Sequence, residues 1–318
     1  MNELFLGHEI WMWAMFMAIV AFLLVMDLGV LNKGDKEISA KRSLTIYTFY
    51  IAMALAFGGW IWWEMGPDKA MTYYTGYVIE QSLSMDNLFV MALIFGYFKI
   101  PRAYQHRVLF WGILGVIVLR GIMIGVGAAL VAEFHWLLYI FSAFLVYSGL
   151  KMLKTDHDSM DIEHNPVLNF LKKHVRVSNR IHGHDFFVKE ADSSGKMVTA
   201  ITPLMVALIL IECADVIFAV DSVPAIFALT TDTYIIYTSN IFAILGLRTL
   251  YFALSAMMAR FEYLKYALAA VLVFIGSKIF LNDFVFEGDK FPPAISLSIT
   301  FGLLLAGVAY SLWKTRKA

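Results

Sequence analysis

The fold is decided by residues 200–229, AITPLMVALILIECADVIFAVDSVPAIFAL, which are apolar apart from a few acids and hydroxyls. A run of this length is sufficient to cross about 30 Å of hydrocarbon as a helix. Because the apolarity is continuous and does not alternate, the stretch is not a strand of a membrane barrel. It nevertheless contains Glu212, Asp215 and Asp221. The stretch therefore predicts a membrane-spanning helix that carries carboxylates inside the bilayer.

Comparable apolar runs recur along the whole chain, which is 60% apolar and 16% charged. A soluble domain is about half apolar and a quarter charged. The sequence predicts an all-α, polytopic membrane protein, and the first apolar run is expected to stay because it lacks a basic start and a small-residue cleavage site. Nine spans are predicted, at residues 9–31, 43–63, 71–97, 107–131, 136–153, 200–229, 235–257, 264–283 and 293–312.

The positive charges are concentrated in every second connection between these spans, and so on one side of the membrane. Twenty Lys and Arg residues lie in one set of connections and the C-terminal tail: 32–42, 98–106 with the adjoining Arg107, 151–199 and 258–265. The other connections contain only Lys69 and Lys290. Cytoplasmic loops of membrane proteins carry this excess of positive charge. The pattern predicts a multi-pass inner-membrane protein with its N-terminus outside and its C-terminus in the cytoplasm.

The predicted organisation has five parts. These are two N-terminal spans (1–70), a three-span unit (71–153), a cytoplasmic loop (154–199), a second three-span unit (200–284), and a last span with a basic tail (285–318). The loop contains five of the eight histidines and is predicted to end in a small β-hairpin. A regulatory metal site there is imaginable, but no metal-ligand spacing is present, so a solvated polar loop is the favoured interpretation.

The two three-span units resemble each other. An acid pair, Glu80 and Asp86 followed by Asn87, matches Asp215 and Asp221 followed by Ser222. The next span of each unit carries a central Leu-Arg, at Arg120 and Arg248, and the third spans share the pattern Tyr-x3-Ala-x-Leu-Val-x2-Gly-x-Lys, ending at Lys151 and Lys278. Because each unit has three spans, the second copy enters the membrane from the opposite side. An inverted repeat is common in transporters that bind substrate near the bilayer midplane, although duplication for packing alone is the alternative.

Buried carboxylates require partners. Each acid costs about 2.5–3.5 kcal/mol at the centre of a spanning helix, so the five acids must face the protein interior. Arg120 and Arg248 are the predicted charge partners, one in each unit, and Lys278 is expected to reach the outer surface. A divalent cation, or protons, would balance the remaining negative charge, but a permanently paired or protonated polar core is the alternative.

The candidate ligands are hard oxygen donors. The predicted metal site consists of Glu80, Asp86, Asn87, Glu212, Asp215 and Asp221, supported by Ser82, Ser84 and Ser222. Such donors suit Mg²⁺, Ca²⁺ and Mn²⁺. Cys213 and Met85 are the only sulfur atoms nearby, and no histidine lies in the two spans, so zinc and copper are less favoured.

Pro224 bears on the geometry of the second motif. Acids six residues apart point to different faces of a regular helix. Pro224 removes the hydrogen bond to the carbonyl of Val220, so a helix break near Asp221 could turn both acids inward. A tolerated kink is the equal alternative.

At these residues the chain resembles the TerC family of integral membrane proteins, and most of all its Alx-type, alkali-inducible members. The resemblance is carried by Glu80-Gln-Ser-Leu-Ser-Met-Asp-Asn-Leu-Phe-Val90, by residues 212–227, by Leu247-Arg248 and by Asp185-Phe-Phe-Val188 before Thr202. It implies a fold like that of the lysine-exporter (LysE) superfamily and export of Mn²⁺ or a similar cation, with the acids above as ligands.

Three functions therefore remain open: a proton-coupled exporter of a divalent metal, an exporter of another small cation, and a membrane stress-complex or assembly partner of the tellurite-resistance type. An enzyme is not expected, because no histidine or other base accompanies the acids. No resident cofactor and no nucleic-acid partner are expected. The expected partners are the lipid bilayer, the transported ion and protons.

Overall fold

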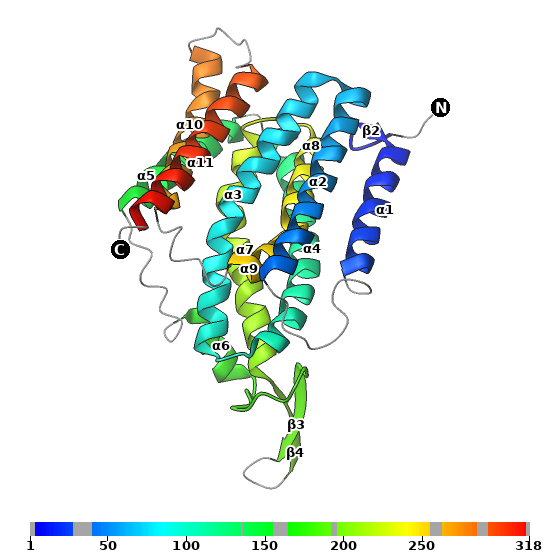
Figure 1. The fold of residues 1–318 in the computed structure, drawn as a ribbon, viewed down its shortest axis with the longest axis vertical. Coiled ribbons are helices and arrows are strands. Elements are labelled where there is room, and N and C mark those ends of the chain that lie inside the picture. Colours follow the sequence, from blue (N-terminus) through cyan, green and yellow to red (C-terminus); the bar gives the residue numbers. More distant parts are fainter. Residues whose placement is uncertain are drawn as a thin grey trace.

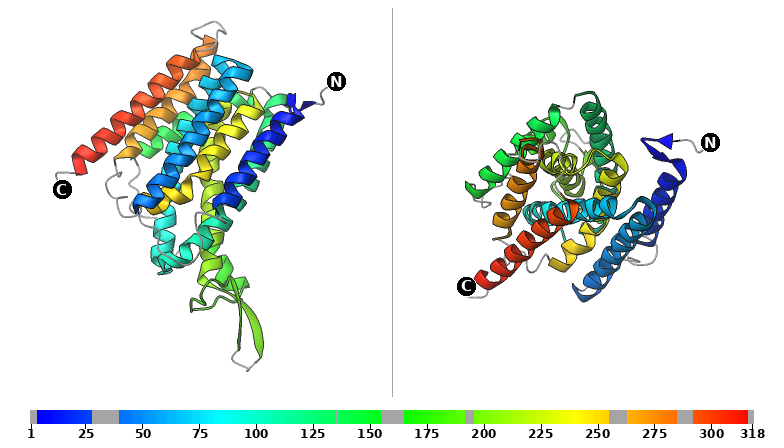
Figure 2. Two further views of the ribbon diagram at one scale, coloured as in Figure 1. Left: turned by 45° about the vertical axis from the view of Figure 1, so that its right-hand side comes forward. Right: turned by 90° about the horizontal axis from the view of Figure 1, so that it is seen from above.

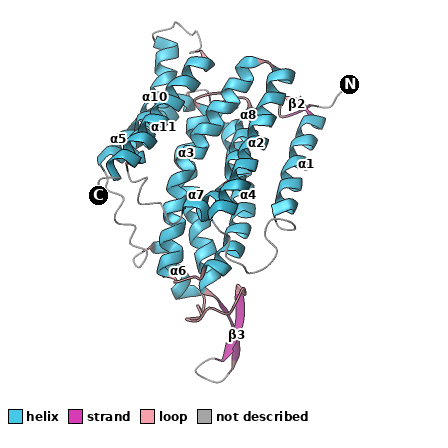
Figure 3. Ribbon diagram, in the orientation of Figure 1, coloured by secondary structure: helices cyan, strands magenta, loops and turns pink. Residues whose placement is uncertain are grey.

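The computed structural model describes residues 4–27, 40–134, 136–154, 165–191, 196–254, 263–284 and 292–315. Within these ranges, the side chains of a few helical residues lie outside the description, among them Asp86 and Asp221. The described chain is almost entirely helical, and its strands form two small hairpins (Figures 1 and 3).

The elements follow one another in the order expected for a helical bundle. The helices are α1 (Ile10–Met26), α2 (Ala40–Met65), α3 (Pro67–Tyr97), α4 (Arg102–Glu133), α5 (Leu137–Lys154), α6 (Pro166–His174), α7 (Pro203–Phe227), α8 (Thr233–Leu245), α9 (Leu247–Leu254), α10 (Leu264–Phe284) and α11 (Pro293–Thr315). The strands are β1 (Leu4–Phe5), β2 (His8–Glu9), β3 (Phe187–Ala191) and β4 (Met197–Ile201).

Seven helices are long and apolar enough to cross a membrane: α2, α3, α4, α7, the α8–α9 segment, α10 and α11. Two further apolar helices, at Ile10–Met26 and Leu137–Leu153, are shorter. All nine coincide with predicted spans. The structure therefore bears out a polytopic helical membrane protein, and the count of nine spans stays a prediction.

Helix α3 lies at the centre of the bundle and packs against α2, α7, α8 and α11. On one side, α5, α10 and α11 form a layer of their own, and α1 lies at the opposite edge (Figure 2). Much of the core between α1, α2, α3 and α8 is aromatic, with Phe16, Phe57, Tyr73, Tyr234 and Phe242 in one buried cluster. Aromatic rings bury large apolar areas and so fix the relative positions of these helices.

Helices α5 and α10 make the most extensive contact in the molecule, and glycines allow it. A Cβ at Gly149 of α5 would lie 2.8 Å from the carbonyl oxygen of Ala269, and one at Gly276 of α10 would lie 2.7 Å from that of Ser142. Gly149 also faces Val273, and Gly276 faces Val146. Two helices that share one sequence pattern thus contact each other through the same positions of that pattern.

Helix α7 differs from one expectation. The sequence favoured a break at Pro224 as strongly as a kink, and α7 instead continues through this proline to Phe227. The proline lies in the last turn, where it removes one hydrogen bond while Ala228 still donates to the carbonyl of Pro224. The helix is therefore continuous at position 221, which corresponds to the tolerated proline and not to a helix break.

The predicted span 235–257 is divided. A turn at Gly246 separates α8 from α9, and a Cβ at this position would lie 3.1 Å from the Tyr47 ring of α2. The close approach of α2 explains why glycine stands there, and Arg248 follows near the start of α9.

The predicted cytoplasmic loop contains the expected hairpin. Strands β3 and β4 pair antiparallel, with Val188 opposite Ala200 and Glu190 opposite Val198. The hairpin projects from one end of the bundle (Figure 1). Its predicted turn at 192–195 and the acidic and histidine-rich residues 155–164 lie outside the described residues.

Candidate functional site

A buried arginine brings the two halves of the chain together. The guanidinium of Arg120, in the middle of α4, donates to Glu80 Oε1 of α3 at 2.5 Å. It also donates to both carboxylate oxygens of Asp215 in α7, at 3.3 Å each. Ser222 Oγ and Asn240 Oδ1 accept from the same guanidinium at 2.8 and 2.7 Å. One side chain thus connects the first acid of each motif.

Two neighbouring side chains complete the network around the acids. Asn87 Nδ2 donates to Asp215 Oδ1 at 2.9 Å, across from α3 to α7. Ser84 donates to Glu80 Oε1 at 3.2 Å, one turn along α3. The predicted supporting roles of Ser84, Ser222 and Asn87 therefore have a geometric basis. Ser82 instead donates to the carbonyl of Val78 in its own helix.

This network is deeply buried: Glu80, Arg120 and Asp215 are 0%, 1% and 3% exposed. When ionised, two carboxylates and one guanidinium leave one net negative charge in a medium where charge is poorly stabilised. In the described part of the chain, Glu80 Oε2 and Asn87 Oδ1 accept no hydrogen bond. The cluster therefore has an uncompensated negative charge and oxygen atoms that are free to act as metal ligands.

Glu212 supplies a third carboxylate nearby. Both of its carboxylate oxygens are buried and have no hydrogen-bond partner among the described residues. The carboxylate lies against the backbone of α4 at Gly115, where an added Cβ would come within 2.4 Å of Glu212 Oε1. Gly115 thus makes the space that this acid occupies, a role that the sequence alone did not suggest.

Arg248 does not join the cluster, in contrast to the predicted pairing of one arginine with the acids of each unit. It forms an ion pair with Asp27 at the end of α1, and both side chains are buried. The difference arises because Asp27, at the end of α1, lies within ion-pairing distance of Arg248. The sequence does contain a signal for this pair, because Asp27 lies within the first predicted span; it is not among the five acids considered above.

The second acid of each motif, Asp86 and Asp221, has a side chain that lies outside the described residues. Their backbones are helical. Among the described residues, no group of three or more His, Cys, Asp and Glu side chains is arranged to hold a metal ion. Arg120 therefore holds Glu80 and Asp215 but not Glu212, and the predicted set of six metal ligands stays a prediction.

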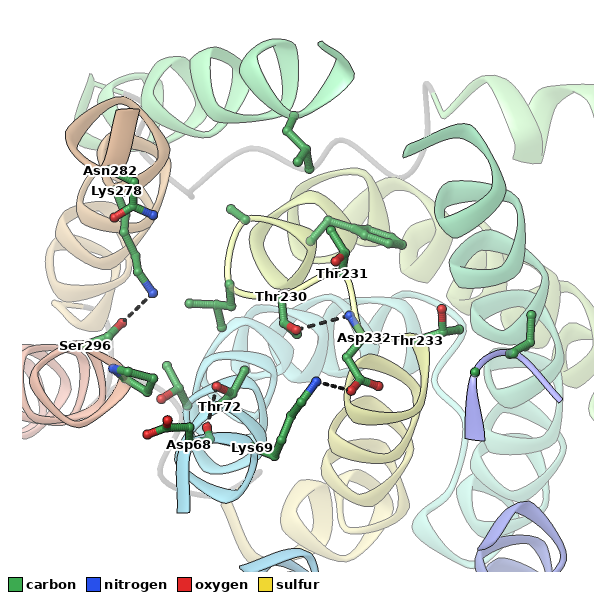
Figure 4. Close-up of a pocket in the computed structure, with 18 of the residues that line it drawn as sticks. Asp68, Lys69, Thr72, Thr230, Thr231, Asp232, Thr233, Lys278, Asn282 and Ser296 are labelled. Carbon is green, nitrogen blue, oxygen red and sulfur yellow. Dashed lines mark hydrogen bonds and ion pairs between the residues drawn. The ribbon is translucent and has the colours of Figure 1, made fainter. Parts of the chain in front are cut away.

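A large cavity lies away from this cluster, at the end of the bundle opposite the β3–β4 hairpin. It has a volume of about 1150 Å³. In its wall, Asp232 accepts from His8 at 2.9 Å and forms an ion pair with Lys69 (Figure 4). Burial opposes ionisation of Asp232, but the hydrogen bond and charge of Lys69, the charge of His8 and the Ile235 backbone outweigh it and lower the pKa of this carboxyl. Asp232 also accepts from the backbone of Tyr234 and Ile235, so it caps α8.

Comparisons with known proteins agree with this architecture. Residues 65–318 match the integral membrane protein TerC family. A Rickettsia bellii protein described as an uncharacterized membrane protein is 46% identical over 94% of this chain and 96% of its own length. Uncharacterized membrane protein STKORF319 of Myxococcus xanthus is 44% identical over 96% and 93%, respectively. The Escherichia coli protein named "putative membrane-bound redox modulator Alx" is 42% identical over 95% and 94%. No solved structure matches the chain.

The family match covers most of the chain, and the relatives align along nearly their whole length with it. The matched residues include both acidic motifs, Arg120 and Arg248. On this basis, the chain belongs to the TerC family of integral membrane proteins.

Proposed function

We propose that this protein is a membrane transporter that exports a divalent metal cation from the cytoplasm, with Mn²⁺ as the favoured ion. The observation that carries the proposal is the meeting of Glu80 and Asp215, from the two similar halves of the chain, at the buried guanidinium of Arg120. Ionisable groups inside a membrane protein mark ion paths and proton relays, because they are too costly to keep there for packing alone.

The donor chemistry supports a hard divalent cation. The cluster offers carboxylate and amide oxygens, and Glu80 Oε2 and Asn87 Oδ1 accept no hydrogen bond from the described residues. Mn²⁺, Mg²⁺ and Ca²⁺ prefer such ligands. The neighbouring Glu212 adds a further buried carboxylate, and Asp86 and Asp221 complete the proposed ligand set.

Arg120 gives the proposal a mechanism. In the described arrangement its guanidinium lies between Glu80 and Asp215 and compensates their negative charge, as a bound cation would. When the metal binds, the carboxylates exchange the guanidinium for the ion. When the ion leaves, Arg120 and protons neutralise them again. Transport of metal would thus be coupled to protons moving in the opposite direction.

The proposal includes an inverted repeat formed by residues 71–153 and 200–284. Two observations support it. Gly149 and Gly276, which are equivalent in the repeat, make reciprocal contacts between α5 and α10. Glu80 and Asp215 are also equivalent, and both bind Arg120. The repeat is not symmetric in its charges, because Arg248, the counterpart of Arg120, pairs with Asp27.

The proposed orientation places the β3–β4 hairpin and the C-terminus in the cytoplasm and the N-terminus outside, in the inner membrane. The distribution of Lys and Arg supports it. The described helices are compatible with it, since β3 and β4 lie at one end of the bundle and β1 and β2 near the other (Figure 1).

The test is Mn²⁺ uptake into inside-out membrane vesicles under an imposed proton gradient. Glu80→Gln and Asp215→Asn each remove one charge from the cluster and should abolish uptake, as should Asp86→Ala and Asp221→Ala. Glu190→Gln, on the cytoplasmic hairpin, is the matched control and should transport normally. Uptake by the unmodified protein that equals that of empty vesicles would refute transport of Mn²⁺. The same uptake assay with Ca²⁺, Mg²⁺ or lysine in place of Mn²⁺ tests the other small cations.

The alternative is a role as a stress-complex or assembly partner. One observation favours it: the projecting hairpin exposes Phe187 and Met197, which are 57% and 60% accessible. Apolar side chains on a projecting element can mark a contact with another protein. A stable complex that purifies with this protein, is lost with Phe187→Ser and Met197→Ser, and accompanies absent metal uptake would establish this function instead. An intrachain disulfide is not available for a redox role, because Cys213 is the only cysteine.

A further inference from the structure

The large cavity opens at the end of the bundle opposite the hairpin. It lies where α3, α8 and α11 begin and where α7 and α10 end, between the central helices and the layer of α5, α10 and α11 (Figures 1 and 4). Its volume of about 1150 Å³ is far larger than a packing defect, since protein interiors contain few voids larger than one water molecule.

The wall of the cavity combines polar and charged side chains with apolar ones such as Leu138, Phe227 and Leu229. Five threonines contribute to it, together with charged residues: Thr72, Thr75, Thr230, Thr231, Thr233, Asp68, Lys69, Asp232 and Lys278. Lys278, expected to reach the outer surface, is 6% exposed, and its ammonium lies 3.5 Å from Ser296 Oγ of α11 (Figure 4). A cavity that is merely left over between apolar helices would be lined by apolar side chains, so this lining fits a water-filled space.

Helix register places the cavity above the second acid of each motif. On α3, position 86 is 11 residues after Thr75, which brings it back to within about 20° of the same face. On α7, Ala228 also lines the cavity and is seven residues after position 221, again about 20° away. The faces of α3 and α7 that form the cavity wall therefore continue down to positions 86 and 221.

Apolar side chains lie between the cavity and these positions, and on α3 the distance from Thr75 to position 86 is 11 residues, or about 16 Å of helix. Ile79 and Leu83 of α3 and Ala225 of α7 belong to one buried cluster, together with Ala228. On the opposite side of the acid cluster, a space of about 20 Å³ is lined by Asp215 and Arg248, among others. That space holds at most about one water molecule. The large cavity therefore lies on one side of the buried acids, and a much smaller space lies on the other.

We propose that the large cavity is the outer vestibule of the ion path, through which the exported cation leaves, and that the described conformation is open to the outside. The inference rests on the proposed function. It adds the exit route and the lining residues, and it assigns Ile79, Leu83 and Ala225 to the barrier between vestibule and site.

Cysteine labelling tests the vestibule independently of transport. In a Cys213→Ser background, Thr72→Cys should react with a membrane-impermeant thiol reagent added from outside. Thr238→Cys in α8 is the matched control. Thr238 is buried and donates to the carbonyl four residues earlier, but it does not line the cavity. It should remain unlabelled. Labelling of Thr72→Cys only from the cytoplasmic side, or from neither side, would overturn the vestibule.

Transport by the same variants then tests whether the vestibule lies on the ion path. Reaction of Thr72→Cys with a bulky thiol reagent should reduce Mn²⁺ export several-fold relative to the unreacted variant. Complete labelling with unchanged export would overturn the assignment as an exit route. If the parent Cys213→Ser protein does not export, the proposed function fails while the labelling result still reports the cavity.

Discussion

At the scale of single residues, Arg120 has the most consequential environment. It is 1% exposed and donates to Glu80, Asp215, Ser222 and Asn240 at once. Breaking a buried ion pair by removing one partner leaves a charge without compensation. The stability of the bundle and the charge state of the proposed site therefore depend on the same side chain.

Arg120→Gln should lower the free energy of unfolding by about 3–5 kcal/mol, because it leaves two buried carboxylates unpaired. Adding Glu80→Gln and Asp215→Asn to this variant should recover part of the loss. Thermal unfolding of the purified protein in detergent measures the effect. Arg107→Gln on the same helix is the control; its guanidinium lies over the Phe186 ring at 5.0 Å and should cost about 1 kcal/mol or less. Equal losses for both arginines would contradict the assigned role of Arg120.

Gly115→Ala should displace the carboxylate of Glu212, because the new methyl group would overlap it. We expect reduced metal uptake with normal expression. Gly125→Ala on the same helix meets nothing within 4 Å and should be neutral or stabilise by up to about 1 kcal/mol. If Gly115→Ala transports like the unmodified protein, Glu212 does not need its observed position.

At the scale of elements, the contact of α5 with α10 is sensitive to side-chain volume. An alanine at Gly149 would meet the Ala269 carbonyl, and one at Gly276 would meet that of Ser142. Each substitution should cost about 1–3 kcal/mol, as overpacking commonly does. Gly302→Ala in α11 meets nothing and is the control. A reciprocal interface predicts similar losses of melting temperature for Gly149→Ala and Gly276→Ala, and a loss at only one of them would argue against it.

The stability that Asp232 contributes at the start of α8 should depend on pH. The contacts of Asp232 with Lys69 and His8 favour its ionised form, and its pKa lies below the ordinary value of about 3.9. A carboxyl with a lowered pKa stabilises the fold fully above its ordinary pKa and loses this contribution as the pH falls toward the folded-state value. The difference in melting temperature between the unmodified protein and Asp232→Asn should therefore be constant from neutral pH to about pH 5 and shrink below about pH 4. A difference that does not change on acidification would contradict this account.

The elements also show what the sequence could and could not predict. Helix positions follow from apolar runs, because every backbone group in a bilayer must be satisfied within its own helix. The pairing of Arg120 with Glu80 and Asp215 was predictable in kind, since buried carboxylates need partners. The pairing of Arg248 with Asp27 was not, because it depends on how α1 and α2 dock against α9 and on the turn at Gly246. The continuity of α7 through Pro224 likewise depends on where the proline falls in the helix.

At the scale of the whole molecule, the described conformation is asymmetric across the membrane. A cavity of about 1150 Å³ lies on one side of the buried acids, and a space of about 20 Å³ lies on the other. Alternating access requires a second conformation in which these sizes are reversed. Arg248 and Asp215 both line the small space, so the Asp27–Arg248 pair is a contact that such a change would have to accommodate.

We propose that the carboxylates around Arg120 bind a divalent cation in exchange for protons. Equilibrium binding of Mn²⁺ to the purified protein, with simultaneous measurement of released protons, tests this exchange. We expect saturable binding, release of protons on binding, and loss of both in Glu80→Gln and Asp215→Asn, with Glu190→Gln unchanged. Saturable Mn²⁺ binding that persists undiminished in both cluster variants would contradict it.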